Sequence, residues 1–389
     1  MSSLLSHLEC ARCGRRHDAD RLQNRCGCGG TLLARYDLAR ADHGRMAARP
    51  PGLWRYRELL PVRGDPVSLG TPQTPLLFAA RLTDRWGVET YIKDEGLLPG
   101  GTFKARGAVV GLSRALELGA DQLVMPSAGN AGGAWALHAA RAGVSLTVTM
   151  ARAAPAVSRA EVVAAGATLE LVDGTITDAA ARADEIARRT GAFLCATFAE
   201  PYRLEGKKAG WLEAFDQLGD GSSMGLPRTI VLPVGGGVAL AGAAKAAAEV
   251  RALGWAGEEA PSLVGVQAAR CAPVVRAFDR GDVEVRSWDG DGATVAAGLR
   301  VPAPSEGAWV LECVRASGGS MVAVDDDEIV GSIADLAKSE GVLACPEGAA
   351  TVAAGNALAA SSALEGPVVL YNTGTGVKYA DAVERAGRS

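Results

Sequence analysis

Short apolar runs and longer Ala-rich stretches alternate along most of the chain. The apolar runs are rich in Val, Ile and Leu and carry few charges, as expected for parallel strands that are buried on both faces. The stretches between them have the length of helices. Strands are predicted at 89–93, 122–125, 145–150, 168–172, 193–195, 229–232, 263–266 and 368–371, and helices at 103–118, 131–142, 156–165, 177–189, 239–253 and 349–360. The alternation predicts an α/β fold with parallel sheets.

The length and local composition predict the domain organisation. A chain of 389 residues is too long for one ordinary domain and fits two domains with an appendage. We expect an N-terminal segment at 1–38, a large α/β domain made of 39–95 and 205–389, and a small α/β domain at 96–204. Residues 39–75 are rich in Arg and Pro and predict an extended segment.

The overall composition narrows the class of protein. Hydrophobic residues make up 48% of the chain, enough for large buried cores, and the net charge of −4 argues against nucleic acid as the main partner. Arg or Asp interrupts each apolar stretch before it reaches the length of a membrane span. The N-terminus lacks a basic and then apolar leader, so we expect a cytoplasmic protein that does not bind membranes.

Four of the eight cysteines are concentrated near the N-terminus. Cys10 and Cys13 form one pair, and Cys26 and Cys28 form a second pair that two glycines follow. In a cytosolic protein such a cluster more often binds a metal than forms disulfides. Four thiolates can close a tetrahedral zinc site, and the glycines permit tight turns. The sequence therefore predicts a structural zinc ribbon, and a cysteine-rich loop without metal is the alternative.

Lys104 lies in a glycine-flanked loop, Gly100-Gly101-Thr102-Phe103-Lys104-Ala105-Arg106-Gly107. A lysine held close to an electrophile and partly out of water can form a Schiff base or move a proton. Glycines on both sides let the backbone approach a cofactor. The neighbouring Phe103 offers a ring for stacking. The loop is therefore a candidate catalytic site.

Three further loops follow predicted strands, where ligands bind in open parallel sheets. Ser127-Ala128-Gly129-Asn130 leads into a helix and can hold a carboxylate with its N–H groups, although a plain helix cap is the alternative. Gly235-Gly236-Gly237 also precedes a helix and can form a phosphate nest, without the spacing of a Rossmann fingerprint or a P-loop. Asn372-Thr373-Gly374-Thr375-Gly376 offers a hydroxyl for a ring nitrogen.

Histidine is scarce, with four residues in the whole chain. This scarcity disfavours a Ser-His-Asp triad and a His-ligated catalytic metal. The chemistry must then depend on lysine, backbone donors and a cofactor. Together with the four loops, this indicates pyridoxal phosphate (PLP) acting on a small amino-acid substrate.

The combination of motifs resembles the fold-type-II PLP enzymes, the tryptophan synthase β family, and within that family it resembles threonine synthase most. The matching stretches are 101–107, 127–132, 205–208, 234–237, 346–350 and 372–379, and the cysteine-rich N-terminus followed by 32–37 also matches. The resemblance covers essentially the whole chain. It implies two doubly wound parallel-sheet domains with PLP in the cleft between them, and a homodimer.

The resemblance also implies a role for individual residues. Lys104 would carry PLP as a Schiff base and act as the general base. Phe103 would pack near the ring, Asn130 would hydrogen-bond the O3′ oxygen, and Thr373 would face the pyridine nitrogen. The phosphate of PLP would be held by Gly235, Gly236, Gly237, Val238 and Ala239, and the substrate carboxylate by Ser127, Ala128 and Gly129.

The reaction implied by threonine synthase converts O-phospho-L-homoserine and water to L-threonine and phosphate, by γ-elimination and β-replacement. The substrate phosphate needs cations in addition to those for PLP. The candidates are Arg106, Arg159, Lys207 and Lys378, each of which can also be an ordinary surface charge.

Several positions depart from the threonine synthase pattern. Ala105 stands where Asp is common, Ala128 and Ala131 where hydroxyl residues are frequent, and Thr375 where His is common. The triple glycine at 235–237 is more similar to a dehydratase. One alternative is therefore a β-eliminating lyase, dehydratase or β-replacement enzyme acting on serine, threonine or an O-activated amino acid. A binding protein that keeps the fold without activity is a third hypothesis, which the intact lysine loop disfavours.

Overall fold

The computed structural model describes residues 3–388 and divides the chain into two compact units. Unit 1 comprises Met1–Gln73 and Lys104–Gly210, and unit 2 comprises Thr74–Phe103 and Trp211–Ser389. The sequence analysis expected domain boundaries at residues 38, 95 and 204, and the two units divide after Gln73, Phe103 and Gly210. The expected boundaries stay a prediction. Each unit therefore combines two distant parts of the sequence.

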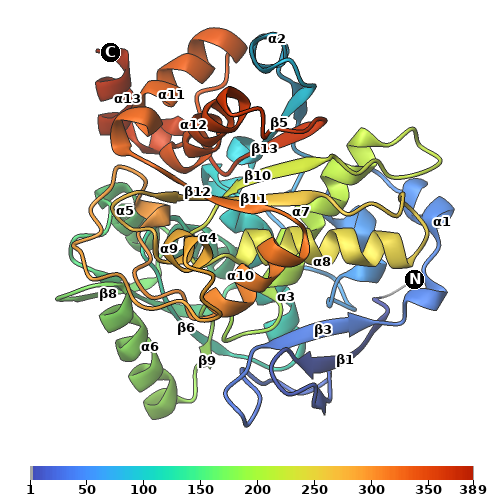
Figure 1. The fold of residues 1–389 in the computed structure, drawn as a ribbon. Helices are drawn as coiled ribbons and strands as arrows, with labels where there is room; N and C mark the ends of the chain where they lie inside the picture. Colours follow the sequence, from blue (N-terminus) through green and yellow to red (C-terminus); the bar gives the residue numbers. More distant parts are fainter. Residues whose placement is uncertain (1–2, 389) are drawn as a thin grey trace. The chain divides into compact units, whose positions relative to one another are not determined.

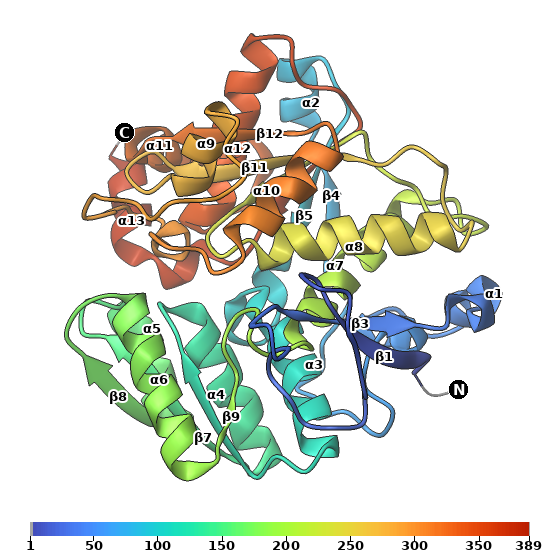
Figure 2. The ribbon, with the colours of Figure 1, turned by 60° about the horizontal axis from the view of Figure 1, so that its bottom comes forward.

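A four-stranded parallel sheet forms the centre of unit 1. Its strands stand in the order β8 (Thr168–Val172), β7 (Ser145–Ala151), β6 (Gln122–Pro126) and β9 (Phe193–Leu194). The helices of this unit are α3 (Lys104–Glu117), α4 (Asn130–Ala142), α5 (Ala156–Ala164) and α6 (Ile176–Thr190). Figure 2 shows β7 and β8 beside α5 and α6. Strands and helices alternate because each crossover between parallel strands needs a helix-length connection.

The N-terminal residues form a small antiparallel sheet within unit 1. Its order is β2 (Arg16–His17), β1 (Leu5–Cys10) and β3 (Leu32–Tyr36). Leu8 and Leu32 are fully buried and share one hydrophobic core with Leu112 of α3. Thr31 Oγ1 donates a hydrogen bond of 2.8 Å to the carbonyl oxygen of Phe198. The N-terminal sheet is thus part of the core that supports α3.

Residues 39–75 differ from the extended segment that the sequence predicted. They contain α1 (His43–Ala47) and the 3-10 helix η2 (Leu53–Leu59), and η1 (Leu38–Arg40) lies just before them. Leu53 is buried in a small core with Val109 and Ala209. The prediction was wrong for 43–59, because the Arg and Pro content concealed apolar side chains that bury against helices distant in the sequence, whereas 60–75 contains no helix or strand.

A six-stranded sheet forms the centre of unit 2. Its order is β12 (Ser320–Val324), β11 (Ser262–Ala268), β10 (Thr229–Pro233), β13 (Val368–Asn372), β5 (Thr90–Asp94) and β4 (Leu76–Phe78). All neighbouring pairs are parallel except the edge strand β4, which is antiparallel to β5. Figure 1 shows β10 to β13 and β5 in this sheet. The parallel α/β fold predicted from the sequence is confirmed.

The helices of unit 2 pack on this sheet and on one another. They are α2 (Ala80–Trp86), α8 (Val238–Ala252), α9 (Pro273–Asp279), α10 (Gly307–Ala316), α11 (Asp326–Glu340), α12 (Pro346–Ala360) and α13 (Ala380–Gly387), with the short helices η3 (Glu95–Leu97), η4 (Pro99–Gly101), η5 (Ala297–Leu299) and η6 (Gly376–Lys378). The helix α7 (Arg203–Leu218) begins in unit 1 and ends in unit 2. Across residues 3–388, none of the helices combines the length and apolarity that a bilayer crossing requires.

Candidate active site

Lys104 is the first residue of α3 and is half-buried. The chain passes from unit 2 to unit 1 at the peptide bond between Phe103 and Lys104. The loop before the lysine contains η4 and is held by backbone hydrogen bonds within unit 2. A lysine at the first turn of a helix, partly withdrawn from water, is suited to proton transfer and Schiff-base chemistry.

Two of the predicted cofactor-binding residues meet within unit 2. The backbone N–H of Phe103 donates to the carbonyl oxygen of Thr373 at 2.9 Å, although the two residues are 270 positions apart in the sequence. The adjacent Thr102 and Gly374 form an isolated β-bridge. The structure therefore brings the lysine-bearing loop and the loop after β13 together.

The Phe103 ring is buried and packs edge-to-face against Tyr371, with ring centroids 5.6 Å apart. Tyr371 in turn packs against Trp211 at 4.7 Å. Such aromatic contacts fix ring orientation as well as burying apolar area. Phe103 is thus held in unit 2 by its contact with Tyr371. The sequence analysis did not identify Tyr371 and Trp211 as residues that support this ring.

The glycine loop after β10 has the geometry of an anion cradle. A side chain at Gly235 would collide with the carbonyl oxygen of Gly298. Gly237 has a φ of +82°, in the left-handed region that favours glycine, and forms the N-cap of α8 without a side-chain cap. The first N–H groups of a helix have no partners inside the helix, so they can bind a phosphate. The loop therefore fits the phosphate of PLP.

The Ser127 loop lies in unit 1, between β6 and α4. Ser127 Oγ accepts hydrogen bonds from the backbone N–H groups of Gly129, at 3.1 Å, and Gly132, at 2.9 Å. Asn130 is the first residue of α4, and its N-cap Gly129 provides no side-chain cap. The loop thus uses the serine hydroxyl to hold its own backbone in place, while Ala128 is half-buried.

The candidate cations have different surroundings. Arg106 is fully buried. Its side chain packs against Gly210 of α7, where a Cβ atom would come within 3.0 Å of Arg106 Nε. Lys378 Nζ donates to the carbonyl oxygen of Gly100 at 3.0 Å. Arg159 of α5 is half-buried, and its buried Nε has no hydrogen-bond partner among the described residues. Lys207 of α7, the fourth candidate, is buried at 2% exposure.

The α5 helix also lies close to the Ser127 loop. A side chain at Gly129 would come within 3.5 Å of Ser158 Oγ and 4.0 Å of Pro155 Cδ. Ser158 directly precedes Arg159 in the first turns of α5. The structure thus brings the predicted carboxylate loop and Arg159 into the same part of unit 1.

The four cysteines of the N-terminal sheet gather as predicted. Their sulfur atoms all lie within 4.8 Å of one another, with Cys10–Cys28 and Cys13–Cys28 at 3.5 Å and Cys13–Cys26 at 3.7 Å. A backbone hydrogen bond from Gly30, and then the neighbouring sulfur atoms, lower the pKa of Cys28 to about 7. A tetrahedral zinc site with Zn–S bonds of about 2.3 Å has sulfur atoms about 3.8 Å apart. The cluster therefore has the dimensions of a four-thiolate metal site.

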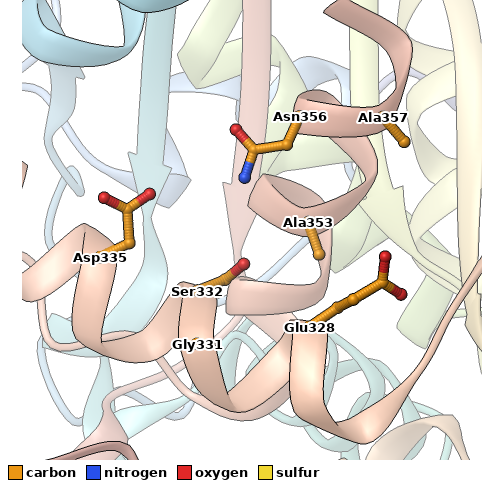
Figure 3. A pocket seen from close by; sticks show the side chains of 7 residues that line it. All are labelled: Glu328, Gly331, Ser332, Asp335, Ala353, Asn356 and Ala357. Carbon is orange, nitrogen blue, oxygen red and sulfur yellow. The ribbon is translucent and has the colours of Figure 1, made fainter. Parts of the chain in front are cut away.

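A hollow between α11 and α12 contains none of the predicted site residues. Figure 3 shows its lining by Glu328, Gly331, Ser332, Asp335, Ala353, Asn356 and Ala357. Asp335 pairs with Arg85 at 2.5 Å, and Asn356 Oδ1 accepts a hydrogen bond from Trp86 at 2.9 Å. These polar groups bind α2, so the hollow is a packing feature of unit 2.

Comparison with known proteins identifies the family. A family described as "Pyridoxal-phosphate dependent enzyme" matches residues 67–374. The chain belongs to this family. It is 33% identical to the threonine synthase of Methanosarcina acetivorans over 89% of this chain and 85% of the relative. It is 32% identical to the threonine synthase of Methanocaldococcus jannaschii over 97% of this chain and 94% of the relative.

A solved structure with a similar fold supports this result. Threonine deaminase isoform 2 from Solanum lycopersicum, in its processed form, superimposes with a TM-score of 0.67 over 81% of this chain and 88% of that chain. Its sequence is 24% identical, so the likeness concerns the fold alone. The predicted fold class and PLP-dependent enzyme class are therefore confirmed.

Cys345 and Glu347 are buried polar residues that the sequence analysis did not assign to the site. Cys345 is the N-cap of α12, and its Sγ lies 3.3 Å from Thr373 Oγ1. Glu347 Oε1 accepts a hydrogen bond of 2.7 Å from the backbone N–H of Gly298, the residue that closes the glycine cradle. Glu347 lies within the 346–350 stretch that matches the family, whereas Cys345 directly precedes that stretch.

Proposed function

We propose that the protein is a threonine synthase, which converts O-phospho-L-homoserine and water to L-threonine and phosphate. The observation that carries the proposal is the identity of 32% to a threonine synthase over 97% of the chain. The half-buried Lys104 and the glycine cradle supply the groups that the reaction needs.

PLP, when bound, supplies a ring that accepts electrons from the reacting carbon atoms. We assign Lys104 Nζ to the aldehyde carbon of PLP and Phe103 to the face of its ring. Asn130 would donate to the ring oxygen, and Thr373 Oγ1 would face the ring nitrogen. The phosphate would be held by the backbone of Gly235, Gly236, Gly237, Val238 and Ala239.

The remaining steps use groups of the chain itself. Lys104 Nζ would be the base that takes the α-proton of the substrate, returns that proton to the bound substrate and cofactor, and only then takes a proton from the β-carbon. The backbone N–H groups of Ser127, Ala128 and Gly129 hold the substrate carboxylate. The guanidinium of the half-buried Arg159 would bind the substrate phosphate. Phosphate leaves from the γ-carbon, and water adds at the β-carbon.

The competing hypothesis is a β-eliminating lyase acting on serine or threonine, which the dehydratase-like triple glycine favours. A substrate panel decides between the two. The holoenzyme is incubated separately with O-phospho-L-homoserine, L-threonine and L-serine, and phosphate, threonine and 2-oxo acids are quantified. We expect phosphate and threonine from the first substrate and only background 2-oxo acid from the others. Formation of 2-oxobutyrate or pyruvate without phosphate release would favour the lyase.

We also propose that Cys10, Cys13, Cys26 and Cys28 hold one structural zinc ion. The sulfur–sulfur distances of 3.5 to 3.7 Å support the proposal. Four thiolates leave zinc without an open position, so the ion would support the fold rather than catalyse a reaction. A homodimer, which the resemblance implies, and a cytoplasmic location, which was expected from the sequence, stay predictions.

A further inference from the structure

The hydroxyl group of Thr373 has a buried thiol as its neighbour. Thr373 is 5% exposed and Cys345 is 1% exposed. Their Oγ1 and Sγ atoms lie 3.3 Å apart, within hydrogen-bond distance for sulfur. A hydroxyl carries one hydrogen and two lone pairs, and a thiol can act as a weak donor or a weak acceptor. The direction of the Thr373 O–H therefore depends on which of the two groups donates.

The other neighbours of the thiol limit how it can be arranged. The backbone N–H of Gly348 donates to Cys345 Sγ at 3.3 Å, so the sulfur already accepts one hydrogen bond. Asn372 Nδ2 donates to Asp94 Oδ1 at 2.8 Å, which turns the amide oxygen of Asn372 toward the thiol at 3.7 Å. The distance from Cys345 Sγ to Thr373 Oγ1 is shorter, at 3.3 Å. The S–H group thus has a closer acceptor in Thr373 Oγ1 than in Asn372 Oδ1.

The thiol is present as S–H at neutral pH. Burial, and then the negative charge of Glu347, raise the pKa of Cys345 well above that of an ordinary thiol. Glu347 is itself 5% exposed and is tied to Gly298 by a hydrogen bond of 2.7 Å. A thiol in these surroundings is a neutral donor, and no thiolate competes for the hydroxyl hydrogen.

We propose that Cys345 is a positioning residue, whose S–H donates to Thr373 Oγ1 and directs the Thr373 O–H toward the ring nitrogen of bound PLP. The inference rests on the cofactor assignment made above and deepens it. An unprotonated ring nitrogen is a better acceptor than sulfur, so the hydroxyl hydrogen turns to the ring when the cofactor binds. The hydrogen bond from the Cys345 S–H to Thr373 Oγ1 then stabilises the hydroxyl group in this orientation.

The test is a double-mutant cycle on PLP binding, measured without substrate. PLP is titrated into the apoprotein of wild type, Cys345→Ala, Thr373→Val and the double variant, and the dissociation constant and visible absorption spectrum are recorded. Cys345→Ala should weaken PLP binding about fivefold, as expected for one lost neutral hydrogen bond. In the Thr373→Val background the same change should have almost no effect, because the hydroxyl that Cys345 orients is gone.

Two further variants separate positioning from packing. Cys345→Ser keeps a donor and an acceptor at the same place and should restore affinity to within about twofold of wild type. Cys271→Ala removes another buried thiol of unit 2 and should leave PLP affinity and spectrum unchanged. Melting temperatures of the apoproteins are recorded for each variant, so that a loss of stability is not mistaken for a loss of binding.

Equal effects of Cys345→Ala in the wild-type and Thr373→Val backgrounds would overturn the proposal, and so would a Cys345→Ser protein that binds PLP no better than Cys345→Ala. If Cys345→Ala does not fold, a structure of the wild-type holoenzyme decides. The proposal requires Thr373 Oγ1 at about 2.8 Å from the ring nitrogen, with Cys345 still at hydrogen-bond distance behind it. Because the assay contains no amino acid, its outcome is independent of whether O-phospho-L-homoserine is the substrate.

Discussion

Lys104 combines two properties that a catalytic lysine needs. Its position at the start of α3 fixes the backbone, and its partial burial limits the water around its amine. The residue after it, Ala105, is fully buried in unit 1. A larger side chain at this position would have to be accommodated in a fully buried place.

Replacing the lysine tests its role directly. Lys104→Ala should lose the yellow colour of bound PLP after gel filtration and lower turnover by at least about 10³-fold, because one group supplies both attachment and proton transfer. Lys338→Ala, an exposed lysine on α11, is the matched control and should keep both properties. A Lys104→Ala protein with turnover similar to that of the control would show that another residue is the base.

The sequence predicted most of the strands and several helices closely, and its failures have physical reasons. The helix α7 was not predicted, because Gly206 and Gly210 lower its helix propensity. In the structure a side chain at Gly206 would collide with the carbonyl oxygen of Arg106, so the glycine permits the close approach of α3. Helix α11 was missed as well, although Asp325 and Glu328 form a capping box that marks its start.

Among the predicted site residues too, some carry a local sequence signal and others depend on the tertiary fold. Loops that carry a local signal, such as 127–130 and 235–237, could be predicted from glycines and strand endings, and their roles stay predictions. Cys345 was not found, because only the tertiary fold brings α12 beside the loop after β13. Arg106 was selected for its charge, and its complete burial along α7 is likewise a property of the tertiary fold.

The N-terminal sheet gives a prediction at the level of an element. Because it shares a hydrophobic core with α3, removing its metal should weaken the support of the helix that begins with Lys104. Wild-type protein should contain one zinc ion per chain. Cys10→Ser should lose it and melt at least about 5 °C lower, since metal-binding energy at a structural site contributes to folding.

Metal analysis checks the predicted zinc content, and calorimetry on the same samples checks the predicted fall in melting temperature. Cys313→Ser, which changes a cysteine of α10 outside the cluster, is the control and should retain the zinc. Wild-type protein purified without chelator that contains no zinc would refute the metal site.

At the scale of the whole molecule, the chain is a PLP-dependent enzyme whose two units each contribute parts of the predicted machinery. Unit 1 carries Lys104, the Ser127 loop and Arg159, and unit 2 carries Phe103, the glycine cradle and Thr373. The parallel sheets that place these loops were predictable from apolar runs alone. The sequence departs from the threonine synthase pattern at Ala128, Ala131 and Thr375, and these departures concern the substrate and not the cofactor.

Isotope transfer from water tests the proposed reaction most directly. The holoenzyme is incubated with O-phospho-L-homoserine in H₂¹⁸O, and the products are quantified and analysed by mass spectrometry. The account predicts equal amounts of threonine and phosphate, with ¹⁸O in the threonine hydroxyl and none in the phosphate, because the C–O bond at the γ-carbon breaks and water adds at the β-carbon. Homoserine with ¹⁸O in the phosphate, or no phosphate release at all, would contradict the account.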